Sequence, residues 1–373
     1  MNISASVLKN GEKAILNLRS LYSRYGYSQY KMSKFEEYDL YVRNKDFLVS
    51  DNIITFTDTN GRLMALKPDV TLSIIKSSDK LLADGGLYKV YYDEKVYRVS
   101  DGVGAFKEIT QTGLECIGDV DDYTICEVLM LAAKSLGSIS ENFILDVSNL
   151  DVISSVTETL ALSADAVSEI IKCIGEKNAH GVRAICEREG VSSDAIIKLI
   201  TSYGAPAKVI PEVRSVLPEE KQYLADRLEN ITKALESAGF KGKINIDFSV
   251  TGSAKYYNGF VFKGFIDGVS AGILSGGQYD RLMTRMNRTS RAIGFAVYLD
   301  LLERLEKSEV DFDVDTVVLY DDGADLKVLS DAVAMLTANG KSVSALKKIP
   351  EKLKYRQLLR LNERGVEILE NNA

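Results

Sequence analysis

The chain contains very few of the residues that most often carry acid–base and metal chemistry in enzymes. Its 373 residues include one histidine, His180, and no tryptophan. A His-ligated zinc site and a relay of histidines each need several imidazoles, and a Ser-His-Asp triad has a single candidate base here. Because His180 lies next to Gly181 in a helical segment, we interpret it as a surface residue or a helix cap. Any chemistry therefore has to come from carboxylates, arginines and the backbone.

Cysteine is scarce as well, and its spacing argues against two of its usual roles. The chain has four cysteines, Cys116, Cys126, Cys173 and Cys186. They form no Cys-x-x-Cys pair, and they are too sparse for a disulfide framework in a chain of this length. We interpret them as small buried apolar residues, and we predict no metal site and no cofactor.

Long hydrophobic runs and an excess of positive charge are also absent. No apolar run approaches the roughly 18 residues that span a bilayer, and residues 1–11 lack the basic start and apolar core of a signal peptide. We therefore expect a cytoplasmic protein without a membrane segment. The 46 Lys and Arg against 53 Asp and Glu give a net charge of −7. This balance argues mildly against nucleic acid, because binding phosphates requires a basic face.

The first third of the chain has the pattern of an antiparallel sheet with flanking helices. Residues 4–25 carry apolar side chains at helical spacing and end at Gly26, which predicts an amphipathic helix. Thr59-Asn60-Gly61 separates two strand-like runs and predicts a tight hairpin. The expected elements are a helix over 4–25, strands over 54–58 and 62–66, a helix opening at 67–69, strands over 87–92 and 95–99, and a long strand over 106–117.

A helical segment then interrupts the sheet. From about residue 150 to residue 240 the apolar residues recur at helical spacing and strand patterns are lost. Strand patterns return afterwards, so the sheet closes later in the sequence. The expected elements of this closing part are strands over 244–250, 255–266 and 269–274, the glycine pair Gly276-Gly277, and a last helix over about 292–305.

The tail from Asp315 alternates strand and helix patterns, which predicts a small α/β domain with a parallel sheet. Its expected elements are strands over 316–320, 342–346 and 366–369, and helices over 325–338 and 351–363. The expected fold class is therefore α+β, with an antiparallel sheet and helices, a helical insertion over about 150–240, and the small C-terminal domain. We expect domains over 1–310 and 311–373.

The strand over 106–117 offers a candidate binding face. Side chains alternate along a strand, so every second residue shares a face. Gln111 and Glu115 lie about 13 Å apart along it, and Gly113 leaves a gap between them. A gap flanked by an amide and a carboxylate suits a small polar ligand such as an amino acid. The alternative is that this face is solvated, as antiparallel sheets permit. The side chains on this face are those of Lys107, Ile109, Gln111, Gly113 and Glu115.

A series of short motifs also runs through the chain in a defined order and spacing. The motifs are Leu66-Lys67-Pro68-Asp69-Val70-Thr71, Tyr97-Arg98 leading to Gln111-Thr112-Gly113-Leu114-Glu115, Lys255-Tyr256-Tyr257-Asn258-Gly259-Phe260-Val261-Phe262, Ser275-Gly276-Gly277-Gln278-Tyr279-Asp280, and Ile293-Gly294-Phe295-Ala296. This series resembles the ordered motifs of the class II histidyl-tRNA synthetase fold over about residues 5–305. The tail is similar to a shortened anticodon-binding domain.

The resemblance implies a histidine pocket. In that family the α-amino group of histidine is held by an acid, a threonine and a strand glutamine, and these roles fall on Asp69, Thr71 and Gln111. The imidazole is read by a strand glutamate and a tyrosine, which match Glu115 and Tyr257. These roles make chemical sense, because an ammonium pairs with a carboxylate and an imidazole N–H pairs with a buried acid. The histidine-binding residues that we predict are Asp69, Thr71, Arg98, Gln111, Glu115, Tyr256 and Tyr257.

The arginines with which that family neutralises ATP are largely missing. Arg98 matches one of them, but Ser100-Asp101 replaces the Glu-Arg pair that follows it. Lys107 matches the next arginine, and Thr251-Gly252 and Leu301 stand where two others are expected. One donor of this kind is worth about 3 to 4 kcal/mol of transition-state stabilisation. We infer that adenylation chemistry is absent, and we predict no catalytic residue.

A synthetase-like chain that keeps a histidine pocket and lacks these arginines resembles the regulatory subunits of ATP phosphoribosyltransferase, the first enzyme of histidine biosynthesis. In that family the subunits associate with a short catalytic subunit, support its activity and transmit feedback inhibition by histidine. The resemblance implies a non-catalytic subunit in a hetero-oligomer, with self-association through the synthetase-like dimer interface. Ser33 stands where the first synthetase motif usually has proline, near that interface. We expect residues 100–105 to carry the allosteric switch.

Two other functions remain as alternatives. A divergent histidyl-tRNA synthetase would activate histidine with ATP and transfer it to tRNA, although Leu301, Thr251-Gly252 and the acidic balance argue against it. An RNA-binding or scaffolding protein would use a basic cluster in the tail, for which a solvated helix face is the simpler interpretation. This cluster consists of Lys347, Lys348, Lys352, Lys354, Arg356 and Arg360.

Overall fold

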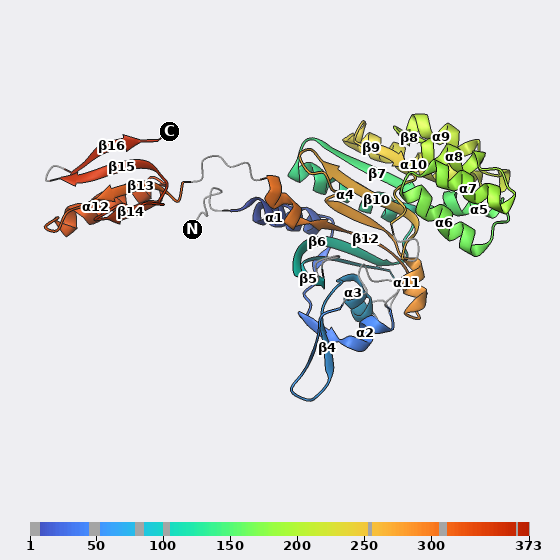
Figure 1. Cartoon of the computed structure of the whole chain (residues 1–373), viewed down its shortest axis with the longest axis horizontal. Helices are drawn as coiled ribbons and strands as arrows, with labels where there is room; N and C mark the ends of the chain where they lie inside the picture. Colours follow the sequence, from blue (N-terminus) through green and yellow to red (C-terminus); the bar gives the residue numbers. More distant parts are fainter. Residues whose placement is uncertain are drawn as a thin grey trace. The chain divides into compact units, whose positions relative to one another are not determined.

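The computed structural model describes residues 8–44, 53–78, 86–99, 105–252, 256–305, 312–362 and 365–372. The chain divides into two compact units (Figure 1). The larger unit is Asn10–Leu305, and the smaller unit consists of Glu306–Ala373 with Met1–Lys9. Residues 100–104, most of the segment expected to carry the switch, lie outside the described residues. Within the described ranges, no helix combines the length and apolar character that crossing a bilayer needs.

A nine-stranded sheet forms the framework of the larger unit. All neighbouring strands in it are antiparallel except the pairs β1–β5 and β7–β9. Its strands, in spatial order, are β1 (Ser28–Gln29), β5 (Leu87–Val99), β6 (Phe106–Gly118), β12 (Arg291–Tyr298), β11 (Leu274–Gln278), β10 (Asn258–Ile266), β7 (Phe143–Asn149), β9 (Ile244–Asp247) and β8 (Tyr203–Gly204). The elements that close this sheet come from both sides of the helical insertion, as predicted.

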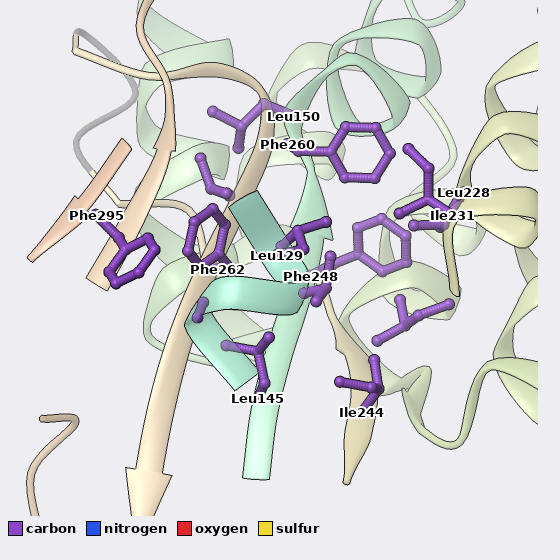
Figure 2. Close-up of a cluster of buried hydrophobic side chains, with 14 of the residues drawn as sticks. Leu129, Leu145, Leu150, Leu228, Ile231, Ile244, Phe248, Phe260, Phe262 and Phe295 are labelled. Atoms are coloured by element: carbon purple, nitrogen blue, oxygen red, sulfur yellow. The ribbon is translucent and has the colours of Figure 1, made fainter. Parts of the chain in front are cut away.

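Helices α1 (Asn10–Arg24) and α4 (Asp122–Ile139) contribute to the main core, together with one face of the sheet. Within this core the Tyr22 ring centroid lies 6.1 Å from that of Tyr91 and 6.0 Å from that of Phe295. Figure 2 shows a part of this core that includes Leu129 of α4, Leu145 of β7 and Phe260 of β10. Leu114 and Cys116 of β6 point into this core, so Gln111, Gly113 and Glu115 lie on the opposite face.

A second layer covers part of that opposite face. It contains a three-stranded antiparallel sheet in the order β2 (Phe35–Glu37), β4 (Leu63–Leu66), β3 (Thr55–Thr57), with helices α2 (Tyr38–Val42) and α3 (Thr71–Ser77). The expected hairpin is confirmed, and Gly61 takes a left-handed φ of 80° in its turn. Tyr41, Ala65 and Leu72 pack here against Val90 and Tyr92 of β5. The binding face of β6 is therefore enclosed between two layers.

The helical insertion follows β7, as the sequence predicts. Its helices are α5 (Leu150–Glu158), α6 (Ala164–Gly175), α7 (Ala179–Glu189), α8 (Asp194–Thr201), α9 (Pro206–Arg214), η4 (Glu219–Lys221), α10 (Gln222–Leu235) and η5 (Glu236–Phe240). It lies at the β8–β9 end of the sheet (Figure 1). Arg227 of α10 pairs with Asp122 of α4 at 2.5 Å and stacks over Phe260, which ties the insertion to the main core. His180 is exposed in the first turn of α7, as predicted.

Two sequence predictions about the sheet are wrong, because polar residues and glycines that locally predict breaks lie inside continuous strands. Residues 87–99 form one strand, β5, in which Asp93 accepts a hydrogen bond from Thr112 and pairs with Arg19 at 2.5 Å. The strand predicted at 269–274 is instead β11, and it contains Gly276 and Gly277. A Cβ added at Gly276 would lie 2.4 Å from the carbonyl oxygen of Gly294, so close packing of strands requires glycine there.

The last helix predicted in this unit, over 292–305, is also wrong. Residues Arg291–Tyr298 form β12, and the 3₁₀ helix η6 (Leu299–Leu305) follows. Ile293, Phe295 and Val297 alternate into the main core, which is a strand period and not a helical one. The helix predicted from residue 4 begins at Asn10, and residues 4–7 lie outside the described residues.

All four cysteines are free; Cys116 and Cys186 are buried, whereas Cys126 and Cys173 are only partly buried.

The smaller unit is an α/β fold whose sheet is mixed and not parallel as predicted. Its elements are β13 (Val314–Leu319), α12 (Leu326–Ala338), β14 (Val343–Leu346), β15 (Tyr355–Asn362) and β16 (Gly365–Asn371), and the sheet order is β14-β13-β15-β16. The helix predicted over 351–363 is wrong, because β15 pairs in parallel with β13 and antiparallel with β16. Leu359 and Leu361 alternate into the core beside Leu336 of α12.

Candidate functional site

A cavity of about 410 Å³, here the first cavity, opens on the enclosed face of β6. Every residue that the sequence predicts for ligand binding lines it. Asp69 lies in the turn before α3 and Thr71 begins that helix, Arg98 is on β5, and Tyr257 precedes β10. The predicted residues brought together here are Asp69, Thr71, Arg98, Gln111, Glu115, Tyr256 and Tyr257.

Glu115 is the carboxylate most tightly held in the cavity. It is 3% exposed, its Oε1 accepts a hydrogen bond from Thr71 Oγ1 at 2.8 Å, and its Oε2 accepts one from the Tyr279 hydroxyl at 2.6 Å. Burial raises the pKa of Glu115 to about 8, against the opposing effect of these two donors. Gly294 faces it from β12, and a Cβ added there would lie 1.8 Å from Oε2. The neighbouring strand therefore leaves room for this carboxylate only because residue 294 is glycine.

Asp69 provides a second carboxylate, which is fixed by a backbone hydrogen bond and lies within the electrostatic influence of Arg98. Its Oδ1 accepts a hydrogen bond from the amide of Leu72 at 3.0 Å, as expected for an acid before a helix. Burial raises the pKa of Asp69, while backbone amides and the charge of Arg98 act in the other direction. Arg98 also holds the turn itself, because its Nε donates to the carbonyl of Pro68 at 3.0 Å.

The alternative of a solvated face is wrong for the part of β6 that carries Gln111 and Glu115, although Lys107 on the same face is exposed. Gln111 and Glu115 are 4% and 3% exposed. The gap expected above Gly113 is not open either, because the ring of its cross-strand neighbour Tyr92 fills it. A Cβ added at Gly113 would lie 2.6 Å from the Tyr92 hydroxyl. Glycine at 113 therefore makes room for a tyrosine whose hydroxyl lines the cavity.

Tyrosines form much of the remaining wall. The ring centroid of Tyr256 lies 4.6 Å from that of Tyr257 and 5.8 Å from that of Tyr279. Burial raises the pKa values of Tyr92, Tyr256 and Tyr279 well above the ordinary range, so these phenols stay protonated and can donate hydrogen bonds. Tyr92, Tyr279 and Tyr298 were missed as site residues. Tyr279 lies in a quoted motif, whereas Tyr92 and Tyr298 are revealed only by the strand register.

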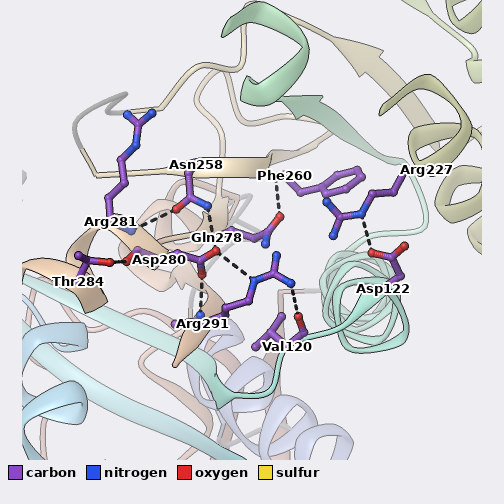
Figure 3. A network of polar contacts seen from close by, with 11 residues as sticks. Val120, Asp122, Arg227, Asn258, Phe260, Gln278, Asp280, Arg281, Thr284 and Arg291 are labelled. Atoms are coloured by element: carbon purple, nitrogen blue, oxygen red, sulfur yellow. Dashed lines mark hydrogen bonds and ion pairs between the residues drawn. The ribbon is translucent and has the colours of Figure 1, made fainter. Parts of the chain in front are cut away.

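A polar network outside the cavity fixes the strand ends next to Tyr279 (Figure 3). Asp280, the first residue of helix α11 (Asp280–Arg285), accepts hydrogen bonds from the amide of Ala292 at 2.9 Å and from Asn258 Nδ2 at 3.1 Å. Arg291 pairs with Asp280 at 3.3 Å and donates to the carbonyl of Val120 at 2.7 Å. The network thus joins β10, α11 and β12, and it holds Tyr279 opposite Glu115.

The ionisable groups around the cavity favour a cationic ligand, because a nearby positive charge opposes the effect of burial and lowers the pKa of Glu115. Among the described residues that line it, Asp69 and Glu115 are acids and Arg98 is the only basic side chain. Lys107, which replaces a family arginine, pairs with Asp300 at 3.3 Å and does not line the cavity. In the part of the chain that the structure describes, no group of three or more histidine, cysteine and acidic side chains could hold a metal ion. The arrangement suits recognition of an ammonium or another N–H donor.

Sequence comparisons connect this cavity to a known family. A family model described as Histidyl-tRNA synthetase matches residues 6–302. The ATP phosphoribosyltransferase regulatory subunit of Acetivibrio thermocellus is 27% identical over 81% of this chain and 75% of its own length. The regulatory subunit of the same name from Clostridium acetobutylicum is 26% identical over 93% of this chain and 88% of its own length, so its similarity extends into the smaller unit.

Solved structures show the same fold. A crystal structure from Bacillus halodurans, described as an ATP phosphoribosyltransferase regulatory subunit/histidyl-tRNA synthetase, matches with a TM-score of 0.78 and 21% identity over 94% of this chain and 93% of that one. A chain of the HisG:HisZ complex of ATP phosphoribosyl transferase from Thermotoga maritima matches with a TM-score of 0.62 and 18% identity over 78% and 97%. The predicted class II synthetase-like α+β fold and the predicted resemblance to these regulatory subunits are confirmed, and this chain belongs to the histidyl-tRNA synthetase family.

Proposed function

We propose that this chain is a non-catalytic regulatory subunit of an ATP phosphoribosyltransferase and that it binds L-histidine in the first cavity. The observation that carries the histidine proposal is Glu115, an acid buried beside two hydroxyl donors with no basic side chain bonded to it among the described residues. A buried carboxylate in this state is stabilised by a ligand that brings an N–H donor or a positive charge. The imidazole of histidine supplies both, depending on its protonation.

The other end of the cavity suits the α-amino and carboxylate groups of the ligand. Thr71 already uses its hydroxyl hydrogen on Glu115 and also bonds to Tyr256, which leaves one oxygen lone pair to accept from an ammonium. Asp69 and the amide oxygen of Gln111 are further acceptors on the same wall. Arg98 uses Nε on Pro68, which leaves its remaining guanidinium donors for the ligand carboxylate.

Loss of the ATP-neutralising arginines supports the non-catalytic role. Leu301 lies in η6 and packs against the main core, and Thr251 and Gly252 carry no charge into the cavity. A phosphate approaching this site would meet Asp69 and Glu115 with Arg98 as the described opposing charge. Activation of histidine by ATP would therefore lack most of the electrostatic stabilisation that such a reaction needs.

The names of the relatives support the assembly. Several are called ATP phosphoribosyltransferase regulatory subunits, and one structural match is a HisG:HisZ complex. We therefore propose that this chain assembles with a short catalytic subunit and that the complex lies in the cytoplasm.

We also propose self-association through the outer face of the three-stranded sheet, where Phe35 and Phe56 are 46% and 39% exposed and their rings lie 5.5 Å apart. Dimer dissociation by Phe56→Glu in analytical ultracentrifugation would support this, and an unchanged mass would contradict it.

Isothermal titration calorimetry with L-histidine tests the pocket. Above about pH 8, where Glu115 is ionised, we expect binding by the wild type and a loss of about tenfold to a hundredfold in affinity for Glu115→Gln, because a charge-assisted hydrogen bond is worth about 1.5 to 3 kcal/mol. Glu108→Gln on the same strand is the matched control, since Glu108 is exposed and pairs with Lys95 outside the cavity. The absence of binding by the wild type, or equal affinities for all three proteins, would refute the proposal.

Reconstitution with a short phosphoribosyltransferase chain tests the regulatory role. We expect this chain to raise the activity of the catalytic chain, and histidine to inhibit the complex in a manner that Glu115→Gln relieves. Inhibition that persists in the variant would place the feedback site elsewhere.

The match to the synthetase family also keeps a divergent histidyl-tRNA synthetase as a second candidate. That function requires histidine-dependent exchange of pyrophosphate with ATP, which we expect to be absent.

For the smaller unit, we propose a separate domain over about 311–373. Half of its basic cluster is paired, because Lys347, Arg356 and Arg360 each lie within ion-pair distance of an aspartate. We therefore expect no salt-sensitive shift of RNA by the full chain.

A further inference from the structure

A second cavity, also of about 410 Å³, lies on the same face of the large sheet between its strands and the helical insertion. Its floor comes from β7, β9, β10 and β11. Its outer wall comes from Gly175 at the end of α6, Lys177 between α6 and α7, and Tyr203 of β8. Gly252, Tyr257 and Ser275 line both cavities. The Tyr257 side chain therefore stands between two adjacent sites.

Asp146 is the acid in the second cavity that is left with unused acceptor capacity. It is 7% exposed, and its Oδ1 accepts one hydrogen bond from Asn245 Nδ2 at 3.3 Å. Among the described residues its Oδ2 has no hydrogen-bond or ion-pair partner. The neighbouring acid, Asp247, differs because it pairs with Lys177 at 2.8 Å and accepts the amide of Ser249 at 2.8 Å. A carboxylate oxygen on a largely buried side chain that faces a cavity without a protein donor can pair with a ligand cation.

Lys263 supplies the opposite charge. It is the direct cross-strand neighbour of Asp146, lines the same cavity, and is exposed. Its ammonium lies 5.5 Å from the Phe265 ring centroid and is within ion-pair distance of no acid among the described residues. The cavity thus presents a carboxylate and an ammonium side by side, each able to take a ligand group of the opposite charge.

We propose that this second cavity binds a small zwitterion of amino-acid size, with its ammonium on Asp146 and its anionic group on Lys263. A volume of about 410 Å³ falls within the range of small-molecule sites. The rings of Tyr203, Tyr257 and Phe265 line the cavity and offer apolar contacts to the rest of the ligand. This site is additional to the histidine site of the proposed function and uses a different carboxylate. A ligand here would contact Tyr257 from the side away from the first cavity.

A thermal-shift panel on the full chain tests the proposal. The probes are the common L-amino acids, each compared with its N-acetyl derivative, which lacks the ammonium, and its amide, which lacks the carboxylate. We expect at least one amino acid to raise the Tm of the wild type, and both of its derivatives to raise it less. The Asp146→Asn variant should lose affinity for that amino acid at least about tenfold. Lys263→Met should also weaken binding, but by a smaller factor.

Two further variants separate this proposal from the histidine site. The shift caused by the second-cavity ligand should persist in Glu115→Gln, and a shift caused by histidine in the first cavity should persist in Asp146→Asn. Asp267→Asn is the control, because Asp267 is exposed at the end of β10 and outside the second cavity. The proposal is overturned if no amino acid gives an Asp146-dependent shift, or if the amides bind as well as the amino acids. Asp146 and Lys263 would then simply neutralise each other.

Discussion

The two cavities lie on one face of one sheet and each holds a buried carboxylate, but the two acids have different partners. Glu115 in the first cavity already has two hydroxyl donors, at 2.8 and 2.6 Å. Asp146 in the second cavity has one amide at 3.3 Å. Burial raises the pKa of Glu115 to about 8 and that of Asp146 to about 6. Burial therefore determines how strongly each acid resists ionisation, whereas the donors in place determine how closely its geometry is fixed before a ligand arrives.

The difference extends to how the cavities are built. The first is lined by glycines and tyrosines that fit against one another, such as Gly113 beneath Tyr92. The second lies between the sheet and the insertion, and its lysines come from a strand and from the link between two helices. The first cavity is consequently suited to one ligand of defined shape. The second cavity is suited to ligands that are recognised mainly by their charged groups.

The pH dependence of stability should show the largest contrast. Between about pH 4.5 and 8 the unfolded chain has ionised Glu115 whereas the folded chain keeps it protonated, so the folded state binds more protons and stability falls as pH rises. The shift from 4.5 to about 8 corresponds to roughly 4 to 5 kcal/mol across this window. We expect Glu115→Gln to flatten the profile in urea unfolding measured at several pH values, and Glu108→Gln to leave it unchanged. A Glu115→Gln profile as steep as that of the wild type would contradict the assignment.

Matched glycine substitutions should give the next largest difference. At Gly294 an added Cβ would lie 1.8 Å from Glu115 Oε2 and 2.5 Å from the Leu114 carbonyl oxygen, and the backbone atom cannot easily move. At Gly175, in the second cavity, the nearest atom would be Thr251 Oγ1 at 3.0 Å, on a side chain that can rotate. We expect Gly294→Ala to cost about 3 kcal/mol of stability and to abolish histidine binding. Gly175→Ala should stay within about 0.5 kcal/mol of the wild type. Equal unfolding midpoints would show that the first cavity is looser than the geometry indicates.

The sequence predicts the first cavity well because its residues fall in ordered motifs on a few elements. Gln111 and Glu115 share one strand face, so spacing brings that pair together, whereas the site roles of Asp69 and Thr71 follow from the resemblance of their motif to a known family. Tyr92 required the register of β5 against β6, which no local pattern contains. The second cavity was not predicted, since Asp146, Lys177 and Lys263 meet only after the insertion has returned to the sheet.

The errors in secondary structure have a related cause. Glycine pairs and charged pairs predict turns when they are read locally. In β11 the glycines instead allow strands to approach, and in β5 Asp93 and Glu94 find partners in Arg19 and Lys67. Tertiary contacts therefore determine these strands. The helix wrongly predicted over β15 follows the same rule, because pairing with two neighbouring strands outweighs a local helical pattern.

Asp146 should give a smaller pH effect than Glu115, over a lower window. Its pKa is raised from 3.8 to about 6, mainly by burial and also by the charge of Asp247, so stability should fall as pH rises from about 4 to 6. Because solvent reaches part of this group, we expect no more than about 2 kcal/mol. Asp146→Asn should remove this component in unfolding measurements near pH 4 and pH 6 while leaving the change above pH 6 intact. Loss of the change above pH 6 as well would mean that the two acids titrate together.

The smallest contrast concerns one hydroxyl group in each cavity. Tyr279→Phe removes the donor that lies 2.6 Å from Glu115 Oε2 and leaves a buried oxygen without it, which we expect to cost about 1 to 1.5 kcal/mol and to weaken histidine binding several-fold. Tyr203→Phe removes a hydroxyl that accepts from Asn245 Nδ2 at 3.0 Å, on a side chain that is 44% exposed. Water can replace that partner, so its effect should stay below about 0.5 kcal/mol. Urea unfolding and histidine titration of both variants measure these values. The phenylalanine ring keeps the packing in each variant. An equal loss of stability in Tyr279→Phe and Tyr203→Phe would therefore mean that the hydrogen bond from Tyr279 to Glu115 contributes no more than an exposed one.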